Sequence, residues 1–96
     1  IDAEAAIHYL SEAALLGHAI SPVEIGGLYF QGRLVEKNFV SAHFWWSLAK
    51  DRNAPSASKK LGVLLSKMNQ EQKRQAFLLQ NKCERLTLRQ CLNSGL

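Results

Sequence analysis

The chain has 96 residues, of which 47% are apolar and 21% charged, with six glycines and two prolines. That length fits one small domain or a fragment of a longer array, and it excludes a two-domain enzyme. The composition is that of an ordinary globular protein, which excludes a disordered polar tail and a low-complexity chain.

The formal net charge of +4 is divided unevenly between the two halves of the chain. Residues 1–48 carry two basic and five acidic side chains, whereas residues 49–96 carry ten basic and three acidic ones. The basic half makes an acidic partner conceivable, although a charge run of this kind is most often a solvated surface. No uncharged stretch approaches the ~20 apolar residues of a membrane span, so no transmembrane segment is predicted.

The first predicted helix covers residues 2–17. Apolar side chains recur there at steps of three and four, as on one face of an amphipathic helix, at Ala6, Tyr9, Leu10, Ala13 and Ala14. Asp2 is the expected cap of this helix, and Gly17 is its expected end.

The second and third predicted helices form one unit over residues 21–52. Ser21 before Pro22 is typical of a helix start, so a helix is expected from Pro22 up to Gly32, which should end it. After a loop, Asn38 should cap the third helix. That helix carries small and aromatic apolar residues, namely Ala42, Trp45, Trp46 and Ala49.

A fourth helix is expected over residues 54–68, beginning near Pro55, and a fifth over residues 69–90. The fifth helix has Asn69 followed three residues later by Gln72, which is another capping-type start. No segment alternates with period two over a useful length. The predicted fold class is therefore all-α.

The chain matches itself at an offset of 36 residues, which indicates an internal repeat the length of a helix pair. The identical pairs are Ala6 and Ala42, Ser11 and Ser47, Ala13 and Ala49, Gly26 and Gly62, and Leu28 and Leu64. Because Gly26 and Gly62 lack a Cβ, each should let a neighbouring helix approach closely. Bulky side chains should fill the space between the helix pairs, namely Tyr9, Tyr29, Trp45 and Trp46.

Residues 25–35 and the positions that follow them carry a resemblance to a known family. The segment Ile25-Gly26-Gly27-Leu28-Tyr29-Phe30-Gln31-Gly32-Arg33-Leu34-Val35, with Asn38, Ala42, Trp45, Trp46 and Ala49, resembles the Sel-1-like repeat, a relative of the tetratricopeptide repeat. The resemblance covers about residues 2–68, and it departs from the family pattern at Leu34, where a second loop glycine is usual. The structural positions that it assigns are Gly26, Tyr29, Gly32, Ala42, Trp45, Trp46, Ala49 and Gly62.

The resemblance implies an α-solenoid of antiparallel helix pairs, with about five helices and a right-handed superhelix. Residues 1–96 would be a single repeat domain or a fragment of a longer array. Residues 2–17 would be the second helix of one repeat, 21–52 a complete repeat, 54–68 the first helix of the next repeat, and 69–90 a terminal capping helix.

The resemblance also implies a function. In this family the first helix of each repeat lines a concave face, and the repeats act as scaffolds for multi-protein assembly, often in bacterial envelope, secretion or signalling systems. We therefore expect a protein-protein interaction scaffold that binds an acidic or extended segment of a protein partner. The partner-binding positions would be Val23, Gly27, Phe30, Gln31, Lys59, Val63, Ser66 and Lys67, with apolar anchoring from Phe30 and Val63.

Two other functions remain open at the level of the sequence. In the first, the chain is a structural or self-assembling element of a larger array, because so few helices are near the minimum for independent stability. In the second, the basic half is a module that binds an acidic polymer or a membrane surface. Nucleic-acid binding is disfavoured because the aromatic residues that would stack on bases cluster in the first half of the chain.

No motif for catalysis or metal binding is present in the sequence. His8, His18 and His43 form no i, i+4 pair with another ligand, and there is no Gly-x-Ser-x-Gly elbow and no phosphate-binding glycine loop. We therefore expect no enzyme activity, no cofactor and no metal.

Cys83 and Cys91 are spaced too widely for a Cys-x-x-Cys redox or zinc motif. In an unbroken helix the two would lie ~12 Å apart, beyond disulfide reach, so a bridge requires the helix to end between them, near Thr87. A bridge would pin the last segment and indicate an oxidising compartment such as a bacterial periplasm or the secreted fraction. The alternative is a buried Cys83 and a free Cys91 thiol in a cytoplasmic protein, and the sequence leaves both open.

Overall fold

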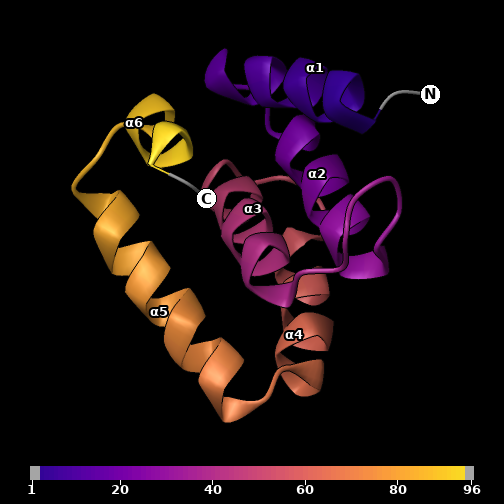
Figure 1. Cartoon of the computed structure of the whole chain (residues 1–96), viewed down its shortest axis with the longest axis vertical. Coiled ribbons are helices and arrows are strands. Elements are labelled where there is room, and N and C mark those ends of the chain that lie inside the picture. The colour runs from indigo at the N-terminus through magenta and orange to yellow at the C-terminus, as the bar shows by residue number, and fades with distance from the viewer. Residues whose placement is uncertain (1–2, 95–96) are drawn as a thin grey trace.

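The described part of the chain is helical throughout. The computed structural model describes residues 3–94, which contain six α-helices and no strand (Figure 1). The helices are α1 (Ala3–Leu15), α2 (Ile20–Gln31), α3 (Phe39–Asp51), α4 (Ala57–Lys67), α5 (Gln70–Glu84) and α6 (Leu88–Asn93). The predicted all-α fold class is confirmed, with six helices where about five were expected. None of the described helices is long and apolar enough to cross a membrane, and the predicted cap Asp2 lies outside the described residues.

The start of α2 differs from the prediction. Ser21 was expected as the cap, but α2 begins at Ile20, and the residue before it, Ala19, already has helical φ and ψ of −85° and −29°. Ser21 is only 7% exposed and is the second residue of the helix rather than its cap. Pro22 is tolerated there because a proline in the first turn removes an N–H group that has no partner within the helix.

The end of α2 and the start of α3 follow the prediction. Gly32 ends α2 in the left-handed conformation, with φ of 71°, and donates its N–H to the carbonyl of Leu28 at 2.9 Å. Asn38 caps α3, because its side chain accepts a hydrogen bond from the Ser41 N–H at 3.0 Å. Local sequence signals therefore define both ends of the loop between α2 and α3.

The fourth helix begins later than predicted, at Ala57. The signal at Pro55 lies in a turn instead, because Asn53 and Ser56 adopt positive φ angles of 61° and 65°. A left-handed residue at position 56 interrupts a helix that would otherwise have started one turn earlier.

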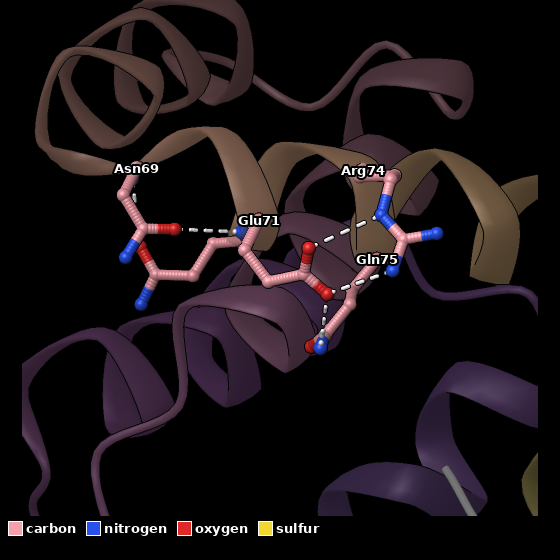
Figure 2. A network of polar contacts seen from close by, with 5 residues as sticks. Asn69, Glu71, Arg74 and Gln75 are labelled. Atoms are coloured by element: carbon pink, nitrogen blue, oxygen red, sulfur yellow. Dashed lines mark hydrogen bonds and ion pairs between the residues drawn. The ribbon is translucent and has the colours of Figure 1, made fainter.

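The predicted capping start of α5 is confirmed. Asn69 accepts from the Gln72 N–H at 2.8 Å, and the Gln72 side chain accepts from the Asn69 N–H at 2.9 Å. Figure 2 shows this start together with the carboxylate of Glu71, which accepts hydrogen bonds from Arg74 at 2.9 and 3.1 Å and from Gln75 at 3.2 Å. These bonds, above all those from Arg74, lower the pKa of Glu71.

The single helix predicted over residues 69–90 is two helices. Helix α5 ends at Glu84, and Thr87 caps α6 by accepting from the Gln90 N–H at 3.1 Å. The break brings Cys83 and Cys91 to a Cα–Cα distance of 5.4 Å, and the two form a disulfide. Cys91 is 1% exposed, so the bridge holds α6 against the interior.

Helix α3 is the centre of the core. Ala42 and Trp46 belong to one buried cluster with side chains from α4 and α5, whereas Phe44 and Trp45 belong to a second with side chains from α1, α2 and α6. The members of the first cluster are Ala42, Trp46, Leu61, Leu64, Met68 and Ala76, and those of the second are Ala14, Ile25, Phe44, Trp45 and Cys91. Two adjacent tryptophans thus place apolar surface on both sides of one helix.

Arg52, at the end of α3, ties that helix to the end of α1. One guanidinium nitrogen donates to the carbonyl of Ala14 at 2.7 Å and to the carbonyl of His18 at 2.8 Å. Ala14 lies in the last turn of α1 and His18 follows the end of that helix, where a cation is favoured by the helix dipole. The Ala14 carbonyl also accepts a hydrogen bond from the Gly17 N–H at 3.0 Å.

The helices enclose one interior. The radius of gyration is 12.3 Å, close to the roughly 12.5 Å of a compact domain of this length. In Figure 1, α4 and α5 diverge from the short loop that joins them, and α5 returns along α3 toward α6. Side chains on the outer sides of α4 and α5 therefore face solvent, and Leu65, Phe77 and Leu78 are 40%, 64% and 51% exposed.

Candidate functional site

A hollow of about 410 Å³ lies between α2 and α4, above the side chain of Trp46 from α3. Its lining comes from three helices and the turn before α4, and it consists of Gly27, Phe30, Gln31, Trp46, Ser56, Lys59, Lys60 and Val63. We refer to it as the α2–α4 hollow. A volume of this size fits side chains of an extended peptide.

The floor of the hollow is aromatic. The ring centroid of Phe30 lies 5.3 Å from that of Trp46 and 5.6 Å from that of Phe39. The indole N–H of Trp46 donates to the carbonyl of Val23 at 3.0 Å, and a Cβ at Gly26 would clash with the indole ring. The tryptophan is therefore fixed from two sides, and the apolar floor is formed before any ligand arrives.

The rim of the hollow is basic. Lys59 is exposed, and the Lys60 ammonium lies 5.7 Å from the centroid of the Trp46 ring, within the range of a cation–π interaction. None of the lining side chains is acidic. The arrangement therefore combines an apolar surface with two positive charges, which suits an apolar side chain flanked by carboxylates.

The structure brings together five of the eight predicted partner-binding residues, namely Gly27, Phe30, Gln31, Lys59 and Val63. The other three lie elsewhere. Val23 packs against a small buried cluster around Ala49. Ser66 is exposed and donates its hydroxyl to the carbonyl of Val63 at 2.6 Å, and Lys67 is exposed at the end of α4.

Three lining residues were missed by the sequence prediction, namely Trp46, Ser56 and Lys60. The lining positions on α4 and its cap residue Ser56 are spaced i, i+3, i+4 and i+7, which is the spacing of one helix face. The family resemblance placed the partner-binding face of this helix at Lys59, Val63, Ser66 and Lys67. These positions lie on the same side of the helix but are displaced toward its C-terminal end. The spacing from Ser56 was therefore a usable signal.

The residues predicted to be structural lie mostly where close packing requires them. Ala42 and Ala49 are fully buried, Trp45 and Trp46 are 2% and 4% exposed, and burial raises the pKa of Tyr29. Two positions correct the prediction. A Cβ at Gly62 would meet no atom within 4 Å, so no helix approaches there, and Tyr9 is 75% exposed rather than filling a space between helices.

A second hollow, of about 270 Å³, lies between α1 and α6. Its polar lining includes His8, Glu12 and Arg89, so that it mixes both signs of charge. This mixture favours no one class of ligand. Among residues 3–94, no three His, Cys, Asp or Glu side chains gather in a way that would hold a metal ion.

Comparisons of the chain with protein-family models, with curated protein sequences and with solved structures find no significant match. The α2–α4 hollow and the sequence pattern around it are therefore the features that point to a function.

Proposed function

We propose that this chain is a protein-binding module of the Sel-1-like type, part of an α-solenoid, which binds an extended segment of a partner protein in the α2–α4 hollow without catalysis. The observation that carries this proposal is the meeting of Phe30, Val63 and Lys59, which are far apart in sequence, on one hollow over Trp46.

The lining chemistry supports binding rather than reaction. It offers aromatic surface, one hydroxyl, one amide and two ammonium groups, and it contains no carboxylate, imidazole or thiol that would act as a general base or nucleophile. Preformed aromatic anchors lower the entropic cost of binding, because few side chains need to be ordered when the ligand arrives. The bound segment would place an apolar side chain over Phe30 and Trp46 and acidic side chains beside Lys59 and Lys60.

The test uses peptides selected by this chain from a random display library, followed by affinity measurements on the wild type and two variants. Val63→Glu and Leu65→Glu are matched, because both residues lie on α4 and are 46% and 40% exposed, but only Val63 lines the hollow. The selected peptides should combine acidic and apolar residues. Val63→Glu should weaken their binding at least tenfold through lost apolar contact and charge repulsion, and Leu65→Glu should leave it within about twofold.

Equal binding by the two variants would place the peptide site outside the hollow. A library that yields no enriched sequence, or only basic ones, would contradict the proposed ligand chemistry.

A further inference from the structure

A third hollow, of about 190 Å³, lies at the end of α5 that leads into α6 (Figure 1). Its lining comes from α3, α5, α6 and the loop before α6. We refer to it as the α3–α5 hollow. It shares no residue with the α2–α4 hollow, so it is a separate candidate site.

The wall of the α3–α5 hollow is apolar. The side chains that form it are Phe44, Leu48, Leu86 and Leu88. The disulfide between Cys83 and Cys91 also lines the hollow and joins α5 to α6 there. The wall is therefore held in place before a ligand arrives, and its chemistry suits a short alkyl chain.

The polar part of the lining includes two carboxylates, those of Asp51 and Glu84. Both side chains are exposed, and neither carboxylate has an ion-pair or hydrogen-bond partner among residues 3–94. No lysine or arginine lines the hollow. Arg52, which follows Asp51, is bonded to main-chain carbonyls near the end of α1, Arg85 lies outside the lining, and Arg89 lines the hollow between α1 and α6. Both carboxylates are thus available to a cation from outside the chain.

The position of these carboxylates on their helices also favours a cation. Asp51 is the last residue of α3, and Glu84 is the last residue of α5. The C-terminal end of a helix is the negative end of its dipole, which disfavours an acidic side chain and favours a positive charge. Helix stability therefore does not account for an acidic residue at both ends, whereas a bound cation does.

Gln80 provides an independent sign of a missing donor. It lies one turn before Glu84 on the same face of α5 and lines the hollow. Its amide oxygen is buried and has no hydrogen-bond partner among the residues that the structure describes. A buried acceptor without a donor is unfavourable and rare in native proteins. A ligand that donates a hydrogen bond here would satisfy it.

We propose that the α3–α5 hollow binds a primary alkylammonium group, with the alkyl chain against the apolar wall and the ammonium beside Asp51, Glu84 and Gln80. An ammonium has three N–H donors and no acceptor, which matches two carboxylates and one amide oxygen. The apolar wall favours an alkyl chain over a hydrated metal ion. The group belongs either to a free amine or to a lysine side chain of a partner protein, because both present the same chemistry.

An NMR titration of the isotope-labelled whole chain with pentylammonium tests this proposal. Binding should shift the side-chain amide signals of Gln80 saturably, with a dissociation constant on the order of millimolar for so small a ligand. Asp51→Asn and Glu84→Gln should each weaken binding about threefold, which is within the range of exposed ion pairs, and the double variant should weaken it about tenfold. Pentanol has the same chain but no charge, so it should bind about tenfold more weakly than pentylammonium.

The matched control is Glu36→Gln, which removes one negative charge from an exposed residue in the loop before α3, at the opposite end of that helix from Asp51. It should leave the dissociation constant within about 1.5-fold of the wild-type value, because a distant exposed charge is screened. Since all three substituted side chains are exposed, circular dichroism should show that the variants keep their helices.

A titration with Nα-acetyl-lysine amide distinguishes the two sources of the ammonium. Binding as tight as that of pentylammonium would assign the group to a lysine side chain, and binding of pentylammonium alone would assign it to a free amine. No saturable shift of the Gln80 signals with either compound would overturn the proposal. Equal binding of pentanol, or an equal loss in Glu36→Gln and Glu84→Gln, would also overturn it.

Discussion

Gly26 and Gly62 are equivalent in the 36-residue repeat but have different surroundings, and replacing each with alanine should therefore change the stability differently. Alanine stabilises a helix interior by about 1 kcal/mol relative to glycine. At Gly62 the new methyl group meets no atom within 4 Å, so the free energy of unfolding should rise by about that amount.

At Gly26 the new methyl group would clash with the indole ring of Trp46. That ring is 4% exposed and hydrogen-bonded to Val23, so it cannot move away easily. Overpacking of this kind costs about 1 to 3 kcal/mol, which offsets or exceeds the gain in helix propensity. The free energy of unfolding of Gly26→Ala should therefore lie about 1 to 3 kcal/mol below that of Gly62→Ala.

Urea unfolding followed by circular dichroism measures both variants, and thermal melting provides a second value, because 1 kcal/mol shifts the Tm by about 4 to 8 °C in a domain of this size. In a Trp46→Leu background the penalty at position 26 should shrink, since the clashing ring is gone. Equal stabilisation by the two alanines would refute the packing of Trp46 on Gly26 and, with it, the geometry of the hollow's floor.

Three further predictions concern the disulfide, one arginine and one histidine. Replacing Cys83 and Cys91 with alanine should lower the free energy of unfolding by about 2 to 3 kcal/mol, as expected for a disulfide that joins residues eight positions apart. A wild-type urea midpoint that does not change when reductant is added would contradict this. Arg52→Met should lower the free energy of unfolding by about 1.5 to 3 kcal/mol, because it removes the charged donor from the carbonyls of Ala14 and His18. A loss below about 0.5 kcal/mol in the same assay, the scale of a neutral surface change, would contradict this. Burial lowers the pKa of the His43 imidazole in the folded protein. The contribution of the neutral imidazole to the free energy of unfolding should therefore be fully present above the unfolded pKa of about 6.5. It should be lost as the pH falls from there toward the lower folded pKa. His43→Gln should flatten that slope, and an unchanged slope in this variant would contradict the prediction.

Local signals determined which helix boundaries were predictable. Asn38 and Asn69 each cap a helix through a side chain that bonds a main-chain N–H three residues on, so the sequence alone locates both starts. The start of α2 was missed because Ser21 is buried by tertiary packing rather than placed at a cap. The break before α6 has a local signal in Thr87 and Gln90, but the apolar spacing that continues through Leu86 concealed it.

Several residues of the candidate site were predictable from the sequence, but the full set of side chains that lines the hollow was not. Phe30 and Val63, which the sequence assigned to one partner-binding face, both line the hollow, because helical spacing and the repeat register determine which residues share a face. Trp46 was expected to be only a packing residue, yet it also forms the floor of the hollow. One edge of its indole ring packs against Gly26, and another part of the ring borders the hollow. Which surface of a large side chain remains open depends on how far apart the neighbouring helices lie, and sequence spacing does not record that distance.

The most direct test of the account compares the indole N–H signals of the two tryptophans by NMR while a selected acidic peptide is added. Trp46 lines the α2–α4 hollow, whereas its neighbour Trp45 is buried on the other side of α3, against α1 and α6. Saturable binding that shifts the Trp46 indole signal and leaves that of Trp45 in place is the result the account predicts. Saturable binding that shifts Trp45 alone, or neither signal, would contradict the claim that the hollow is the binding site.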